Sequence, residues 1–186
     1  MPYEAPVEEP WLGTPVLPDP LALPRVLFDD AFINNHGFGL MHYGCQAISL
    51  SEAETYSGKQ AIEVEWDAAR DKCNFIGFGL SWHQWHPFDI GPILPHAAIE
   101  FYLKMEKGQE KNLPITLALE DYTRNRATLP LKPEYAAGGR FTGQWQKVRC
   151  PLAAFQGNWD STNMKLLFFD LKGAGKVYID EIRLVE

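Results

Sequence analysis

Apolar and polar residues alternate along several short segments of this chain. In residues 60–67 an isoleucine, a valine and a tryptophan share one parity, and acidic residues share the other. Residues 97–105 and 114–122 repeat the pattern. Successive side chains of a strand point to opposite faces, so each segment is predicted to be a strand with one buried face.

The remaining apolar runs are short as well, and Gly, Pro, Asn and Asp separate them. Further strands are predicted at residues 26–28, 43–50, 74–85, 127–131, 145–152, 164–171 and 176–185. No helical periodicity persists for three turns. Many short strands without helices predict an all-β, two-sheet antiparallel jelly-roll β-sandwich.

The first 24 residues differ in composition from the rest. They hold seven of the 14 prolines, together with several acidic residues. Proline blocks both helices and central strands, so residues 1–24 are predicted to be an extended Pro-rich segment. The folded domain is expected to span residues 25–186.

Composition excludes two classes of partner. The formal net charge is -7, whereas nucleic-acid binding needs a basic face. No apolar run approaches the roughly 20 residues of a membrane span, and residues 1–24 show no signal peptide. An acidic surface remains compatible with neutral polysaccharides. The three cysteines are widely spaced, which allows one disulfide at most and favours buried free thiols.

Residues 74–89, NFIGFGLSWHQWHPFD, depart most from what a fold alone requires. By parity Gly77 and Gly79 lie on the face opposite the apolar residues and leave a strip of bare backbone. Glycine inside a strand marks a bulge or the close approach of another group. A strip of exposed backbone beside planar, hydrogen-bonding side chains could receive a sugar ring. The alternative is a simple bulge with core tryptophans.

These features place a binding site on a concave sheet face. Trp85 is expected to stack on a pyranose ring, and polar neighbours are expected to exchange hydrogen bonds with hydroxyl groups. The predicted ligand-binding residues are Gly77, Gly79, Trp82, His83, Gln84, Trp85, His86, Asp121, Tyr122 and Arg126.

The last strand changes parity between Ile179 and Ile182, which predicts an inserted residue, a β-bulge, at positions 180–181. A carboxylate at such a bulge is a candidate Ca²⁺ ligand, which needs oxygen partners such as Asp29 or Asp30 and carbonyl groups of residues 57–59. The alternative is that Asp180 caps a turn by accepting backbone N–H groups.

Four segments resemble the galactose-binding-like β-jelly-roll carbohydrate-binding modules: VLFDDAF, YSGKQAIEVEW, GQWQKVRCPLAAF and KVYIDEIRL. The resemblance covers most of residues 26–185. It implies non-catalytic binding of an oligo- or polysaccharide, a place beside a catalytic domain or partner enzyme, and a secreted, periplasmic or cell-surface location. It also implies a structural Ca²⁺ at Asp29 or Asp30, Ser57, Lys59 and Asp180. The chain has Asp-Asp-Ala where such modules often have Asp-Phe-Glu.

Two other functions stay open at this point. A catalytic jelly roll, either a glycoside hydrolase or a polysaccharide lyase, would use paired carboxylates such as Glu63 and Glu65, or Tyr122 beside arginines. A protein-assembly domain is the other, because the complex I intermediate-associated chaperone has the same fold and a Trp before a Pro-(Leu/Phe)-x-x-Phe element. Here that element is found in residues 145–155.

Overall fold

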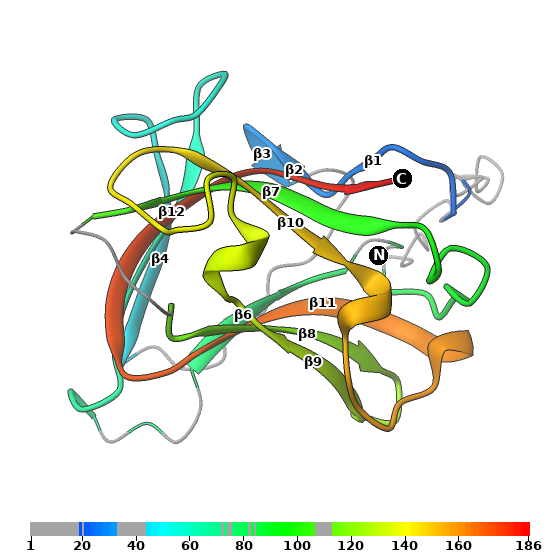
Figure 1. The fold of residues 1–186 in the computed structure, drawn as a ribbon. Coiled ribbons are helices and arrows are strands. Elements are labelled where there is room, and N and C mark those ends of the chain that lie inside the picture. Colours follow the sequence, from blue (N-terminus) through cyan, green and yellow to red (C-terminus); the bar gives the residue numbers. More distant parts are fainter. Residues whose placement is uncertain are drawn as a thin grey trace, which may run out of the picture.

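The computed structural model describes residues 19, 21–32, 44–71, 73, 76–81, 83, 85–106 and 113–186. Their strands form two antiparallel sheets packed face to face, which confirms the predicted all-β sandwich (Figure 1). None of the helices found there is long and apolar enough to cross a membrane. Most of the predicted Pro-rich segment, residues 1–24, lies outside the described residues.

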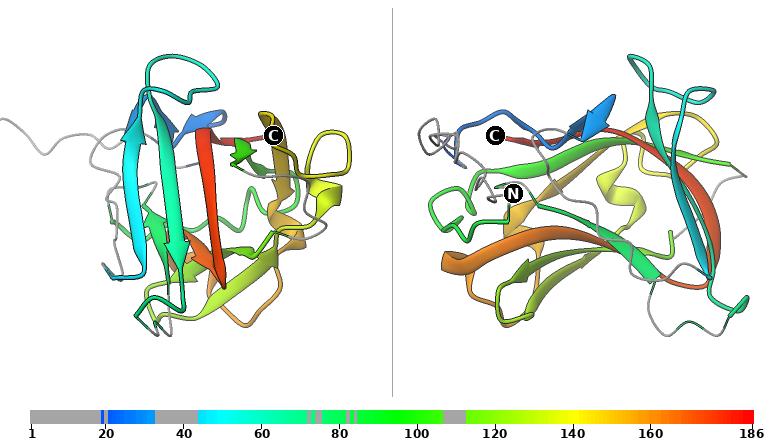
Figure 2. Two further views of the ribbon diagram at one scale, coloured as in Figure 1. Left: turned by 90° about the vertical axis from the view of Figure 1, so that its left-hand side faces the viewer. Right: turned by 180° about the vertical axis from the view of Figure 1, so that it is seen from behind.

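A six-stranded sheet forms one layer of the sandwich. Its order is β10 (Gln146–Pro151), β7 (Ala98–Met105), β12 (Ala174–Val185), β5 (Ala61–Asp67) and β4 (Gln46–Ser51), and β1 (Arg25–Val26) also pairs with β12. In Figures 1 and 2 this sheet follows the long curve of β12.

A four-stranded sheet forms the other layer, in the lower half of Figure 1. Its order is β6 (Ile76–Leu80), β11 (Met164–Leu171), β8 (Ile115–Asp121) and β9 (Arg126–Pro130). The hairpin β2 (Phe28–Asp29) and β3 (Ala31–Phe32) stands apart. Short 3-10 helices lie at Pro133–Tyr135, Leu152–Ala154 and Ser161–Asn163.

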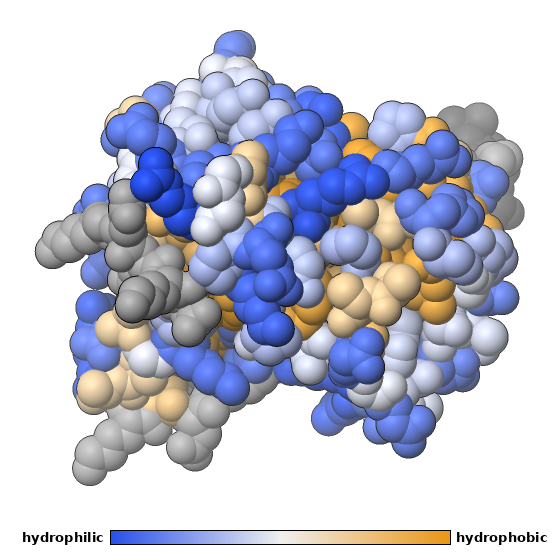
Figure 3. All heavy atoms as spheres, in the orientation of Figure 1, coloured by the Kyte–Doolittle hydropathy of each residue, from blue (hydrophilic) through white to orange (hydrophobic). Residues whose placement is uncertain are grey.

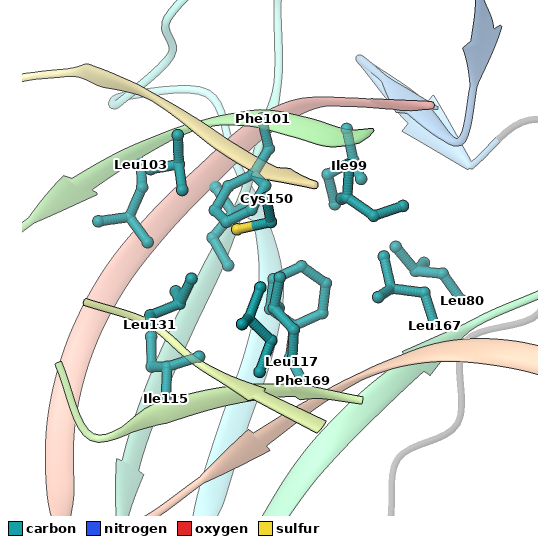
Figure 4. Packing of buried hydrophobic residues seen from close by; sticks show 14 of the residues in the cluster. Leu80, Ile99, Phe101, Leu103, Ile115, Leu117, Leu131, Cys150, Leu167 and Phe169 are labelled. Carbon is teal, nitrogen blue, oxygen red and sulfur yellow. The ribbon is translucent and has the colours of Figure 1, made fainter. Parts of the chain in front are cut away.

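The core lies between the two sheets. Phe101 and Cys150 point from the six-stranded sheet towards Leu117 and Phe169 of the other (Figure 4). The Phe169 ring meets the Phe101 ring edge-on with centroids 5.7 Å apart, and it stacks on Phe78 at 4.6 Å. The long strands therefore bury one apolar parity in the core, as the alternation predicted, and turn the other parity to the outer face. On the outer face of the four-stranded sheet, Ala118, Leu166 and Phe168 form a second buried cluster.

The predicted bulge is present in β12. The register with β7 shifts between Asp180 and Arg183, and Glu181 takes a φ of 49°. Ile179 and Ile182 are both fully buried although their parities differ. The inserted residue lets one strand keep its apolar side chains in the core on both sides of the bulge.

The predicted strands differ from the observed ones chiefly at β6. The strand ends at Leu80, whereas the sequence predicted one that continued to residue 85. The prediction of free thiols is wrong for two of the three cysteines, because Cys45 and Cys73 form a disulfide. Cys150 is free, and burial raises its pKa to about 12.

Candidate functional site

After Ser81 the chain leaves the edge of the four-stranded sheet, and residues 83 and 85–87 belong to a loop that we call the Trp85 loop. Leu80 still pairs with Leu167 of β11, and the chain rejoins the sheet at Phe88, which bridges to Met164. The Ser81 hydroxyl accepts the Trp85 N–H at 2.7 Å, and Trp85 has a φ of 64°. This turn holds the Trp85 side chain outward, where 39% of the residue is exposed.

Tyr122 begins the turn between β8 and β9. Its N–H donates to the carbonyl group of Asn163 at 3.2 Å, and the Lys165 ammonium group lies 5.9 Å from the ring centroid. Tyr122 is 38% exposed. Trp85 and Tyr122 thus belong to two turns that both flank residues 163–164, where β11 begins, and we call this region the Trp85–Tyr122 surface.

Asp121 is fully buried beside Tyr122. Its Oδ1 accepts the Thr123 N–H at 2.8 Å and the Asn125 N–H at 3.0 Å, and its Oδ2 accepts the Asp160 N–H at 2.9 Å. Burial opposes ionisation, but these hydrogen bonds outweigh it and lower the pKa of Asp121 to about 2. Asp121 therefore holds the turn that carries Tyr122, rather than facing a ligand as the sequence suggested.

Arg126 is paired within the protein. Its Nε and Nη2 contact one oxygen of Glu120 at 2.7 and 2.6 Å, and Lys165 contacts the other oxygen at 3.1 Å. The guanidinium carbon lies 4.6 Å from the centroid of the Phe168 ring. Arg126, Lys165 and Glu120 thus form an ionic cluster on the outer face of the sheet, in which two cations share one carboxylate and Phe168 lies beneath the guanidinium group.

Gly77 and Gly79 are buried, so the prediction of an exposed glycine strip is wrong. A Cβ at Gly77 would lie 2.2 Å from the Phe169 carbonyl oxygen and 2.5 Å from the Phe168 ring. At Gly79 it would lie 3.1 Å from the same ring. The glycines do permit a close approach, but the approaching group is the Phe168 side chain.

The outer edge of β6 is also occupied. The Gln46 side-chain amide accepts the Gly77 N–H at 3.0 Å and donates to the Gly77 carbonyl oxygen at 3.2 Å. A buried edge strand needs partners for such groups, and here one side chain supplies both.

His83 and His86 lie in the Trp85 loop, while Trp82 and Gln84 lie outside the described residues. The His83 ring is half-buried, with its centroid 5.2 Å from that of Phe88 and 6.0 Å from that of His86. Burial, together with Arg25 and His86, lowers the pKa of His83. His83 is therefore neutral at pH 7, and His86 is exposed.

Asp30 lies at the predicted calcium site, where its carboxylate is occupied by backbone N–H groups. Its Oδ1 accepts the N–H groups of Lys59 at 2.5 Å and Gln60 at 2.9 Å, and these bonds, that of Gln60 first, lower the pKa of Asp30. A Cβ at Gly58 would lie 2.2 Å from the Asp30 carboxylate. Asp29 is exposed and belongs to β2.

Asp180, the other predicted calcium ligand, also accepts backbone N–H groups. Its Oδ2 accepts the N–H groups of Tyr56 at 2.9 Å and Ser57 at 3.2 Å, and its Oδ1 accepts that of Glu181 at 2.8 Å. Burial raises the pKa of Asp180 against the effect of these bonds. The carboxylates thus face N–H donors, and the described residues contain no metal-ligating group of three or more His, Cys, Asp or Glu side chains. This arrangement fits a turn cap better than a cation site.

The carboxylates considered for hydrolysis are ion-paired. Glu63 contacts Lys176 at 2.9 Å, and Glu65 contacts Arg70 at 3.7 Å. The sequence placed Ser57 in a candidate calcium site and Trp145 in the chaperone-like element, but it did not predict that Tyr56, Tyr102 and Trp145 form an aromatic cluster. Only the outward parity of Tyr102 within residues 97–105 pointed to that cluster.

Comparisons with known proteins decide the class. A family model described as carbohydrate binding domain 30 (CBM30) matches residues 27–186. The chain belongs to this family. It is a non-catalytic carbohydrate-binding module, as the resemblance implied. A search of curated proteins finds no match.

Solved structures share the fold of this CBM30 module. The family 30 module of the cellulosomal cellulase Cel9D-Cel44B of Clostridium thermocellum is 15% identical, with 89% of this chain and 98% of that chain covered and a TM-score of 0.66. A family 11 module of Clostridium thermocellum, in complex with a β-1,3-1,4-mixed-linked tetrasaccharide, is 14% identical, covers 87% and 95%, and has a TM-score of 0.60. An exo-β-agarase is 12% identical, covers 86% and 24%, and has a TM-score of 0.58.

Proposed function

We propose that this CBM30 module binds a β-glucan chain at the Trp85–Tyr122 surface. One observation carries the proposal: two aromatic residues, 39% and 38% exposed, lie on hydrogen-bonded turns that flank the same residues, 163–164. Exposed aromatic rings present an apolar face to the C–H groups of a pyranose ring. Rings held in place before binding lose little conformational entropy when the sugar arrives.

The polar groups of the surface suit sugar hydroxyl groups. His83 is neutral and its Nδ1 is buried, which leaves Nε2 as the nitrogen that can meet a sugar hydroxyl group, and His86 is exposed beside it. Trp82 and Gln84 remain predicted contacts. Gly77 and Gly79 contribute through Phe168 packing, and Asp121 and Arg126 through the turn and the ionic cluster beneath the surface.

The glycan class rests on the related modules. One belongs to a cellulosomal cellulase, and another is in complex with a β-1,3-1,4-mixed-linked tetrasaccharide. A net charge of -7 also favours a neutral glycan over an acidic one. With one or two stacking contacts at an exposed site, the dissociation constant is expected to be micromolar to millimolar, roughly -4 to -8 kcal/mol.

Affinity gel electrophoresis tests the proposal. Wild-type protein, Trp85→Ala and Tyr122→Ala are run through gels that contain mixed-linked β-glucan, hydroxyethylcellulose, xylan or agarose. Leu50→Ala is the matched control, because Leu50 is also 39% exposed but lies on β4 of the other sheet. We expect β-glucan to retard wild type and Leu50→Ala, and both aromatic variants to migrate freely. Equal retardation of all four proteins would refute the site.

The partner and the location follow as proposals. A module of a polysaccharide-degrading enzyme serves to hold a catalytic domain on its substrate, so a catalytic domain or partner enzyme is expected. The Cys45–Cys73 disulfide supports an oxidising location, either secreted, periplasmic or at the cell surface. Fusion to a cellulase domain should raise hydrolysis of insoluble substrate and leave hydrolysis of soluble oligosaccharide unchanged.

Calcium at Asp29 or Asp30, Ser57, Lys59 and Asp180 stays a prediction of the resemblance. The hydrogen bonds at this site oppose calcium binding. Asp180 Oδ2 and Asp30 Oδ1 accept backbone N–H groups, and a bound cation would compete for the same oxygens. Thermal melts in EGTA and in CaCl₂ separate the two cases. A bound ion would raise the melting temperature in CaCl₂, whereas a hydrogen-bonded site without calcium would melt alike in both.

A further inference from the structure

A second exposed aromatic cluster lies on the six-stranded sheet. The loop between β4 and β5 crosses β12, and its Tyr56 ring stacks on Tyr102 of β7 with centroids 3.4 Å apart and an angle of 12° between planes. The Trp145 ring stands beside Tyr56 at 6.1 Å and 65°. Tyr56 is 42% exposed, more than either Trp85 or Tyr122. We call this cluster the Tyr56 platform.

The Tyr56 platform is held rigidly from below. The N–H groups of Tyr56 and Ser57 both donate to Oδ2 of Asp180, which is fully buried at the β12 bulge. The Ser57 hydroxyl donates to Glu181 at 2.5 Å. The loop is thus fixed to the sheet, and the Tyr102 ring supports one face of the Tyr56 ring. Tyr56 is nevertheless 42% exposed, so it can meet a ligand without the entropy cost of ordering a mobile loop.

The surroundings of the Tyr56 platform are polar but electrically compensated. Lys147 lies 5.5 Å from the Tyr102 ring centroid and contacts Glu100 at 2.9 Å, and Lys104 contacts Glu54. On the side of the molecule that Figure 3 shows, hydrophilic residues are interleaved with hydrophobic ones. A protein partner would favour a broad apolar patch, and a polyanion would favour unpaired cations. Stacked rings among neutralised hydrogen-bonding groups favour a neutral sugar.

We infer that the Tyr56 platform is a second carbohydrate-binding surface, which takes a neutral sugar unit of a polysaccharide. It rests on membership of a carbohydrate-binding family and not on the Trp85–Tyr122 surface, which belongs to the other sheet. Two surfaces on different sheets allow one module to contact two neighbouring chains. The consequence is a stronger hold on insoluble polysaccharide than on a soluble oligosaccharide, through effective concentration.

Depletion binding to insoluble β-glucan tests the inference, with NMR titration of cellohexaose as the second readout. The variants are Tyr56→Ala, Trp85→Ala and the double variant, with Leu50→Ala as the control of similar exposure. We expect Tyr56→Ala to weaken binding to insoluble glucan by at least about ten-fold and binding to cellohexaose by less. In Trp85→Ala, cellohexaose should still shift the amide signals of residues 54–58 and 102.

Several results would overturn the inference. If Tyr56→Ala binds insoluble glucan as well as Leu50→Ala does, the platform holds no sugar. The same follows if cellohexaose leaves residues 54–58 unshifted in Trp85→Ala. Tyr56→Phe, which keeps the stacked ring, should bind like wild type and controls for loss of the fold. A change in molecular mass between wild type and Tyr56→Ala in light scattering would assign the platform to self-association. If Trp85→Ala loses binding to insoluble glucan and Tyr56→Ala does not, the Trp85–Tyr122 surface is the binding site and the inference is overturned.

Discussion

At the scale of single residues, the glycines of β6 show what a sequence conveys and what it omits. A glycine inside a strand predicts that another group comes close, and at Gly77 it does. The identity of that group depends on Phe168, which is 91 positions further along the chain and reaches Gly77 only through the pairing of β6 with β11. Sequence spacing carries no information about that pairing.

Gly77→Ala should destabilise the protein. The new Cβ would lie 2.2 Å from a backbone oxygen, which cannot move away as a flexible side chain would. We expect the free energy of unfolding to fall by about 1–3 kcal/mol in chemical denaturation. Gly143→Ala is the control, because its Cβ would lie 3.6 Å from the nearest atom. Equal stability of the two variants would contradict the packing described.

At the scale of elements, β12 and β6 illustrate why some strands were predicted well. The parity change between Ile179 and Ile182 required a bulge, and the structure has it. For β6 the sequence predicted a strand that continues past Leu80, because Trp82 keeps the same parity as the apolar residues before it. The strand ends at Leu80 because the Ser81 hydroxyl captures the Trp85 N–H and begins a turn. Such side-chain hydrogen bonds are local, but parity does not reveal them.

The turn between β8 and β9 should make stability depend on pH in the acid range. The pKa of Asp121 in the folded protein is about 2, below its ordinary value of 3.8. The unfolded chain therefore binds the proton more readily, so the stability that Asp121 contributes is present above pH 3.8 and is lost as the pH falls towards 2. In Asp121→Asn, unfolding monitored by circular dichroism should depend less on pH across this range. An unchanged pH dependence would contradict the stabilising role of the Asp121 carboxylate in this turn.

At the scale of the whole molecule, the disulfide fixes the start of β6 to the start of β4. Cys45 and Cys73 are 28 positions apart. Closing a loop of that length stabilises a fold by about 3–4 kcal/mol in the chain-entropy account. The double variant Cys45→Ala with Cys73→Ala should lose stability of that order in urea. Thiol titration of the unfolded wild type should find one free thiol, and three would contradict the pairing.

The central claim is that a sugar contacts the exposed rings of Trp85 and Tyr122. The most direct measurement is an NMR titration of ¹⁵N-labelled protein with a β-1,3-1,4-mixed-linked tetrasaccharide. Large and saturable shifts are predicted for the Trp85 indole N–H and for the amides of residues 85, 86, 88 and 122–125, while the core strand around Phe101 stays unchanged. Binding that leaves those signals in place would contradict the account.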